Sequence, residues 1–556
     1  MEENKSKQNK ILVAFQFVFD RERKISKYLI FILLGIFTIV GLFLLNDYGS
    51  PWDEYEEITI FIGNIKEYAR LFFGENCKFN RLANWIDFAT DNPNIDHGES
   101  VYYLLIPFSK LFLNGNELLF VRLWRTNVLL VFLTGAYLLY LIVRYFTSDY
   151  RYGLLAVLML MLSPRFFAEG MYNHKDIAQF TLWLGMFWFT ILWMNQQKYK
   201  WAVLLGIVAA FAVNMRFATV MGYLVCGIIY CVKLFKQKEN MGRGILQGLV
   251  SITIFFLIFF LITPASWNNL FSYIWYCVTQ ASSFPWNGEV FFNGMLYAPK
   301  ELTRFYLPVM IALTIPVLFI PLFFCGNFFT IFGRKSIGKD QSKIICRLNF
   351  DSIFLLMITY FPLLAYLIMH PVIYNGWRHY YFLYGFIIIW AILGIQSFLR
   401  LKKRALTRTV CALMAVQLLS MACIIGIGHP YQYSYYNILA GIHPENRYET
   451  DYWGVSGKQI LVELIKEEYC GKPLKITGAE PNCQSILAHG VFILSDQYSD
   501  CIEIVEERQA AEYIFVNFTY CNELRNKDLW DSLTSCEQIC VVNYLSTPLT
   551  AIYRVC

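Results

Sequence analysis

The chain has 556 residues, of which 57% are hydrophobic and only 16% are charged, whereas a soluble domain carries about 25% charged residues. Mean hydropathy is +0.42. This composition excludes an ordinary soluble protein and predicts a mainly α, polytopic helical membrane protein. The net charge of +6 requires no nucleic-acid partner, because membrane proteins concentrate Lys and Arg in their cytoplasmic loops.

About eleven apolar runs are candidates to cross a hydrocarbon core of about 30 Å. They lie near 28–45, 126–146, 153–167, 177–194, 201–214, 217–235, 245–263, 306–325, 352–369, 382–399 and 409–427. Lys and Arg gather in segment 1–27 and in alternate connectors, which predicts a cytoplasmic N-terminus. An odd number of spans then places a long first loop, 46–125, and the tail, 428–556, outside the cytoplasm.

The first outer loop opens with NDYGSPWDEYEE, in which Gly49, Ser50 and Pro51 end the first apolar run. Four carboxylates follow within five residues: Asp53, Glu54, Glu56 and Glu57. At the membrane surface such a cluster is either solvated or takes part in chemistry. Apolar residues from Ile58 to Phe72 then recur at helical spacing, which predicts an amphipathic helix lying on the membrane.

The second outer connector, SPRFFAEGMYNHKD, brings several ionisable groups to the mouth of the membrane. Asp176 alone is explained as an acid in the first turn of a helix, where it complements the helix dipole. That explanation does not account for Glu169 and Lys175 beside it. We therefore keep Lys175 and Asp176 as candidate site residues.

Basic side chains recur at the same face. Arg216 stands between two apolar runs, where it either snorkels to the headgroups or holds a phosphate with its planar fork of donors. Arg378 and His379 lie at the outer edge of the tenth run, in NGWRHYYF. The aromatic connector 264–305 is consistent with an interfacial belt or with the lining of a groove.

WDEYEE, SPRFFAEGMYNHKD and NGWRHYYF together resemble the GT-C glycosyltransferases that use polyprenyl-phosphate sugars. The nearest branch joins protein O-mannosyltransferases and lipid A aminoarabinose transferases, and the resemblance covers roughly 28–400. It implies a GT-C-like fold and transfer of a sugar, with inversion, from a polyprenyl-phosphate donor to a hydroxyl acceptor of unknown identity.

The resemblance also implies roles for residues. Asp53 matches the aspartate implicated in catalysis after the first span and is the leading candidate base, Glu54 matches its neighbour, and Asp176 the carboxylate of the second outer connector. A divalent metal, if one takes part, would lie between Asp53 and Asp176. Independently, cationic groups stabilise a departing phosphate, so Arg216, Arg378, His379 and Lys175 are predicted to bind the donor phosphate. A lipid-linked glycan flippase or other transporter, and a membrane-anchored scaffold, are the alternatives.

From about residue 451 the tail predicts a small α/β domain. Ser456 is a candidate cap for a helix with Ile460, Leu461, Leu464 and Ile465 on one face. LKITG, YIFVNF and LTAIYRV predict strands. Seven of the fifteen cysteines lie here, and pairing among them is possible outside the cytoplasm.

Overall fold

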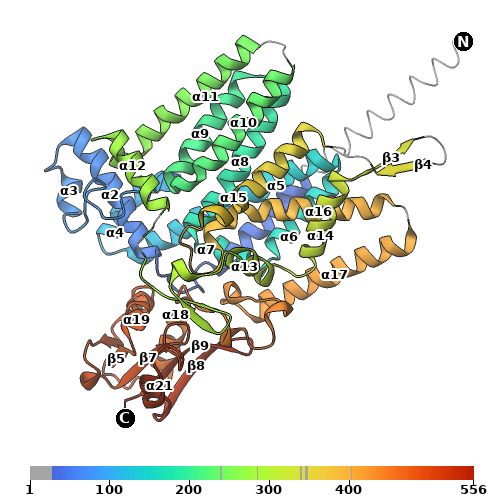
Figure 1. Cartoon of the computed structure of the whole chain (residues 1–556). Helices are drawn as coiled ribbons and strands as arrows, with labels where there is room; N and C mark the ends of the chain where they lie inside the picture. Colours follow the sequence, from blue (N-terminus) through green and yellow to red (C-terminus); the bar gives the residue numbers. More distant parts are fainter. Residues whose placement is uncertain are drawn as a thin grey trace, which may run out of the picture.

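A computed structural model describes residues 28–237, 241–282, 284, 286–337, 341–344, 348–401 and 403–555. The predicted N-terminal segment 1–27 lies outside these residues. Figure 1 shows a large helical body, from the helix Tyr28–Leu44 to α17, and a smaller domain of strands and helices at one end of it. We call that smaller part, Gly457–Arg554, the tail domain.

All eleven predicted apolar runs coincide with helices. They are Tyr28–Leu44, α5 (Glu117–Thr147), α6 (Tyr150–Met161) with α7 (Pro164–Tyr172), α8 (His174–Gln196), α9 (Tyr199–Met215), α10 (Val220–Gln237), α11 (Met241–Ile262), α13 (Tyr306–Thr314) with α14 (Phe319–Ile331), α15 (Phe350–Met369), η5 (Arg378–Leu383) with α16 (Tyr384–Arg400), and α17 (Arg404–Ile427). Seven described helices are long and apolar enough to cross a membrane, or nine if each bent pair is one span. The helices are therefore confirmed, whereas eleven crossings remain a prediction.

Two of the predicted runs are sharply bent. α6 and α7 meet at 76°, and α13 and α14 meet at 114°. Pro164 occupies the first turn of α7, where the missing N–H of proline costs no helical hydrogen bond. The bend directs α7 away from α6 and delivers the stretch Asn173–Asp176 to the start of α8.

The first outer loop folds over the ends of the helical body. It contains α2 (Glu54–Phe73), α3 (Lys78–Leu82), η1 (Ser100–Phe108) and α4 (Ser109–Leu113). The predicted helix is confirmed as α2, but its expected place on the membrane surface is not: between Glu57 and Ala69 only Thr59 and Tyr68 escape burial, so most of the helix is enclosed by protein. Tyr68 donates a hydrogen bond from its hydroxyl to the Leu261 carbonyl at the end of α11 (2.7 Å), so the loop is fastened across that end.

The remaining connectors add short elements. They are η2 (Phe217–Thr219), η3 (Pro264–Ser266), α12 (Leu270–Ser282), η4 (Pro299–Glu301), and two antiparallel hairpins, β1 (Val290–Phe292) with β2 (Met295–Tyr297) and β3 (Arg334–Ile337) with β4 (Gln341–Ile344). β1 also forms a bridge between Phe292 and Tyr448, which ties the aromatic connector to the segment that precedes the tail domain.

The tail domain is an α/β unit around a five-stranded sheet of order β6-β5-β7-β9-β8. Its elements are α18 (Gly457–Glu468), β5 (Leu474–Gly478), α19 (Pro481–Phe492), α20 (Asp496–Ser499), β6 (Ile502–Ile504), η9 (Arg508–Ala510), β7 (Tyr513–Asn517), α21 (Lys527–Thr534), β8 (Gln538–Tyr544) and β9 (Thr547–Arg554). β5 runs parallel to β6 and β7, and β9 runs antiparallel to β7 and β8.

The strands and the helix predicted for the tail are confirmed. The three predicted strands are β5, β7 and β9, and α18 buries Ile460, Leu461, Leu464 and Ile465. The capping prediction for Ser456 is wrong: its hydroxyl makes no cap and instead contacts Asp451 and Thr550. Cys536 is disulfide-bonded.

The linking segment, residues 428–456, joins α17 to the tail domain. It contains η6 (Gln432–Ser434), η7 (Ile438–Ala440) and η8 (Pro444–Asn446). Tyr433, Tyr448, Tyr452 and Trp453 pack into the core of the helical body, whereas Tyr431 and Tyr435 pack into the separate core of the tail domain. The linking segment therefore contributes side chains to both cores.

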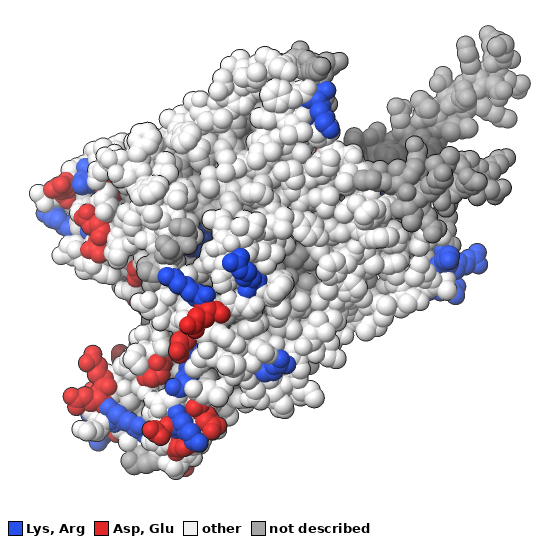
Figure 2. Space-filling model, in the orientation of Figure 1, with Lys and Arg blue, Asp and Glu red and all other residues white. Residues whose placement is uncertain are grey.

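Charged side chains are distributed unevenly on the face drawn in Figure 2. They gather over the tail domain and around α2 and α3, while the helices between carry few. The end of α10, the start of α11, the end of α16 and the start of α17 lie far from the tail domain (Figure 1). This separation is what the predicted topology requires, with basic turns on one side of the membrane and the tail on the other.

We expect the tail domain, but not the α16–α17 turn, to face away from the cytoplasm. Cys470 is an exposed thiol of the tail domain, so a membrane-impermeant maleimide should label it in intact cells. With Cys77, a partly exposed thiol of the first outer loop, replaced by serine in every variant, labelling should disappear in Cys470→Ser and should not be restored by adding Lys403→Cys, at the exposed turn before α17. Labelling of Lys403→Cys without labelling of Cys470 would invert the topology.

Candidate active site

Four of the predicted site residues form a row of alternating negative and positive charges. Arg378 donates from Nη1 to Asp53 Oδ2 (3.0 Å), and the same nitrogen lies 4.0 Å from Asp176 Oδ2. Arg216 donates from Nη2 to Asp176 Oδ1 (2.7 Å). The first outer loop, α8, the end of α9 and η5 thus contribute one charged group each. We call Asp53, Arg378, Asp176 and Arg216 the charge chain.

Only the two ends of the charge chain are accessible. The side chains of Asp53 and Arg216 are 36% and 25% exposed, whereas those of Asp176 and Arg378 are 0% and 5% exposed. Asp53 stands directly before α2, yet its carboxylate makes no capping hydrogen bond with that helix. An acid that is neither a cap nor fully paired is available to a ligand.

The inner guanidinium is held between aromatic rings. Trp453 of the linking segment lies 4.4 Å from the Arg378 guanidinium carbon, and Tyr374 lies 5.2 Å from it, both distances measured to the ring centroids. Such cation–π contacts fix the plane of the guanidinium. Trp286 stacks on Tyr374 with ring centroids 4.2 Å apart, so the aromatic connector 264–305 contributes a side chain to this wall.

Both arginines retain an unused donor. The Nε–H groups of Arg216 and Arg378 are buried and have no acceptor among the described residues. A buried donor without a partner costs about 1–3 kcal/mol. An anionic ligand that accepts from these groups would remove that cost, which suits the predicted phosphate.

His379 lies next to the charge chain but is not linked into it. Its ring meets Tyr374 edge-on at 4.9 Å, and its buried Nδ1 has no partner among the described residues. The structure thus brings Asp53, Asp176, Arg216 and Arg378 together, with His379 beside them.

Glu54 is directed away from this group. Its buried carboxylate accepts two hydrogen bonds from Arg125, at Nε and Nη2, both 2.7 Å, and one from the Ser50 hydroxyl (3.0 Å). Arg125 also donates to the carbonyls of Leu45, Tyr48 and Gly49. With every contact satisfied inside the protein, the geometry does not favour the catalytic role predicted for Glu54.

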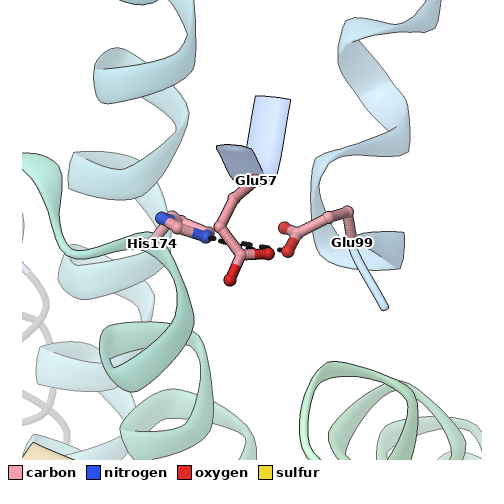
Figure 3. Close-up of side chains that lie close together, drawn as sticks. All are labelled: Glu57, Glu99 and His174. Carbon is pink, nitrogen blue, oxygen red and sulfur yellow. Dashed lines mark ion pairs between the residues drawn. The ribbon is translucent and has the colours of Figure 1, made fainter. Parts of the chain in front are cut away.

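Lys175 also differs from the prediction, because it is engaged by carboxylates. Its Nζ lies 2.7 Å from Glu57 Oε1 and 3.5 Å from Glu99 Oε1, and the side chain is buried. His174 lies 3.6 Å from Glu99, and His97 lies 3.1 Å from Glu57. Figure 3 shows Glu57, Glu99 and His174 pointing toward one another. We call Glu57, Glu99, His97, His174 and Lys175 the glutamate cluster.

Within the glutamate cluster, the pKa values of Glu57 and Glu99 are shifted in opposite directions. Burial raises the pKa of Glu99 to about 7, although His174 opposes the shift. Burial also acts to raise the pKa of Glu57, but attraction by Lys175 and His97 prevails and holds it well below its usual range. Glu57 is therefore a buried, ionised partner of Lys175 and not a solvated neighbour of Asp53.

The possible metal position does not coincide with the predicted one. Arg378 lies between Asp53 and Asp176 and supplies positive charge where a metal would, so these two acids do not fit a shared ion. Among the described residues, one group of three donors has ligand atoms within 4.8 Å of one another: Glu57, Glu99 and His174. Lys175 already compensates the charge of that group.

Sequence reasoning missed Arg125, Glu99 and Trp453. Arg125 stands just before a predicted span, which is itself a signal because an arginine at that depth needs a partner. Trp453 belongs to YETDYWG, whose remaining members are also engaged: Tyr452 donates to Glu169 Oε1 (3.2 Å). The sequence does not reveal that this distant segment reaches Arg378.

Residues 96–267 match the family described as dolichyl-phosphate-mannose-protein mannosyltransferase. This segment holds Glu99, His174, Lys175, Asp176 and Arg216, and the match confirms the resemblance to GT-C glycosyltransferases there. No curated protein matches the chain.

Two solved structures with similar folds are those of ArnT from Cupriavidus metallidurans. The structure bound to undecaprenyl phosphate is 11% identical, with 94% of this chain and 98% of that chain covered and a TM-score of 0.48. The apo structure is 12% identical, with 94% and 97% covered and a TM-score of 0.47.

The Glu54–Arg125 pair should be required for folding stability. Removing one partner of a buried ion pair typically costs about 3–5 kcal/mol of folding stability, because the other charge is left buried without a partner. We expect Arg125→Met to lower the melting temperature of the purified protein markedly. Arg122→Met, at an exposed position one turn earlier on α5, is the matched control and should leave it unchanged. Equal melting temperatures for the two variants would contradict a structural role.

Proposed function

We propose that the chain is an integral membrane glycosyltransferase that moves a sugar from a polyprenyl-phosphate donor to a hydroxyl acceptor at the outer face. The observation that carries this proposal is the charge chain, with an accessible carboxylate at one end and an accessible guanidinium at the other. The family match over residues 96–267 supports the same class of reaction.

The two arginines of the charge chain suit the donor phosphate. Arg216 and Arg378 each offer a free Nε–H beside a carboxylate that already balances part of their charge. When the bond between the sugar and the phosphate breaks, negative charge grows on the phosphate oxygens. Fixed cationic donors stabilise that charge more than they stabilise the ground state.

The carboxylate end suits the acceptor. As the acceptor oxygen bonds to the anomeric carbon, its proton passes to Asp53, and the electron pair of the broken bond leaves with the phosphate. One displacement of this kind inverts the anomeric centre. A phosphate leaving group needs no proton, so one general base is sufficient, in contrast to glycosidases that pair two carboxylates.

The other predicted residues take positioning roles in this proposal. Asp176 is fully buried and orients both arginines. Glu54 fixes the backbone before Asp53, and Lys175 neutralises the glutamate cluster. His379 lines the space beside Arg378 and remains a candidate contact for the donor.

A transporter is the less favoured function. Transporters keep ionisable groups near the bilayer midplane, where they bind substrate and coupling ions. In this chain Asp53, Asp176, Arg216 and Arg378 all lie at the ends of helices.

Asp53→Asn should abolish most transfer without unfolding the protein. The amide keeps the size of the side chain and can accept from Arg378, but it cannot take up the acceptor proton, which costs about 10² to 10⁴ in rate. The measurement is single-turnover transfer by purified enzyme in proteoliposomes. The control is Glu56→Gln, which changes an exposed acid in the first turn of α2. This variant should remain active. Full activity of Asp53→Asn would refute the assignment of the base.

Arg216→Ala and Arg378→Lys should weaken use of the donor. Losing a hydrogen bond to a charged group costs about 1.5–3 kcal/mol, which corresponds to about a ten- to hundredfold loss in kcat/KM for the donor. Lys300→Ala removes an exposed positive charge of another outer connector and should have little effect. Donor kinetics equal to those of the parent protein in both arginine variants would show that these groups do not hold the phosphate.

A further inference from the structure

The linking segment contains an apolar cluster outside every predicted span. Ile438, Leu439 and Ile442 are 81%, 54% and 85% exposed. Further along the described chain, large exposed hydrophobic residues occur singly, at Tyr469, Leu524 and Leu545. Three large aliphatic side chains within five residues are therefore unusual for this part of the molecule.

Most of the backbone N–H groups of this cluster are paired within the protein. Asn437 N–H donates to the Leu313 carbonyl (2.8 Å), Leu439 N–H to the Asn437 side chain (2.9 Å), Ala440 N–H to the Asn437 carbonyl (3.0 Å) and Gly441 N–H to the Ile438 carbonyl (3.3 Å), whereas Ile438 N–H and Ile442 N–H have no acceptor among the described residues. Each pairing lowers the cost of bringing the loop toward hydrocarbon, where an unpaired N–H costs several kcal/mol.

The cluster lies against the break between two apolar helices, α13 and α14. The Asn437 side-chain amide donates to the carbonyls of Ala312 (2.6 Å) and Ile315 (2.7 Å), at the break between α13 and α14. These carbonyls lack helical partners where α13 ends. The segment lies beside α13, between α17 and the tail domain (Figure 1). The cluster is thus fastened to a bent pair of apolar helices.

The sequence before the cluster is free of formal charge, and charges resume after it at Glu445 and Arg447. No Asp, Glu, Lys or Arg occurs between Arg408 and Glu445, so the uncharged stretch runs through α17 and 15 residues beyond its end at Ile427 to Ile442. A surface that docks another protein normally places polar or charged groups at its rim. A surface that enters a bilayer avoids them.

We propose that residues 437–442 form a re-entrant anchor whose aliphatic side chains enter the hydrocarbon of the leaflet nearest the tail domain. The occupant of this surface is lipid, and Asn437 connects the anchor to the α13–α14 break. The anchor fixes the linking segment at the membrane eleven residues before Trp453, which contacts Arg378. The inference does not depend on the proposed function.

The test places an environment-sensitive nitrobenzoxadiazole probe on Ile442→Cys, with the exposed Cys231, Cys411, Cys423 and Cys470 replaced by serine. The whole protein is reconstituted in phosphatidylcholine vesicles with or without brominated acyl chains. We expect blue-shifted emission and quenching by the brominated lipids several-fold stronger than for a probe on Leu524→Cys, an exposed site of the tail domain.

A probe on Ile438→Cys provides a second position should the first variant fold poorly, which size-exclusion chromatography will reveal. Water-like emission and no quenching at both positions would overturn the proposal, and would leave the surface open to a protein partner. The readout requires no catalytic activity, so a failure of the proposed function would not affect it.

Discussion

The site depends on one buried guanidinium, that of Arg125. It joins the end of the first helix to the start of α2 through Leu45, Tyr48, Gly49 and Glu54, while its own backbone belongs to α5. The carbonyls of a chain leaving a helix inside an apolar body need donors, and an arginine needs a carboxylate at that depth. Arg125 supplies the donors that these carbonyls need, and Glu54 supplies the carboxylate that Arg125 needs. Asp53 is held immediately before Glu54, so the position of the accessible acid follows from this contact.

Two helix starts then divide the remaining charges. The beginning of α2 carries Glu57, and the beginning of α8 carries Lys175 and Asp176. Successive residues of a helix point about 100° apart, so Lys175 turns toward the glutamate cluster while Asp176 turns toward Arg216 and Arg378. Neighbouring residues therefore serve two separate networks. Each network balances its own charges, which is the condition for keeping so many ionisable groups at the edge of a membrane.

The linking segment makes the tail domain part of the site. Asp451 accepts a hydrogen bond from Asn517 at the end of β7 (2.9 Å), and its N–H donates to Thr519 (3.0 Å). Two residues later Trp453 lies over Arg378, and the Trp453 carbonyl accepts from the Trp52 N–H (3.0 Å) beside Asp53. The end of the central strand β7, the Trp453 ring and the loop that carries Asp53 are thus connected in series. A rigid tail domain consequently restricts how far Arg378 and Asp53 can move apart.

The sequence by itself determined the class of the molecule, the positions of the helices and the face on which the ionisable groups gather. These follow from periodicity and from the cost of placing charge in hydrocarbon, both of which are local properties of the chain. Only the tertiary structure decided which charges pair. Asp53, Glu54 and Glu57 look alike in WDEYEE, yet they contact Arg378, Arg125 and Lys175 respectively. Pair formation depends on the direction in which each helix start points and on partners up to 325 residues away, and no local pattern carries that information.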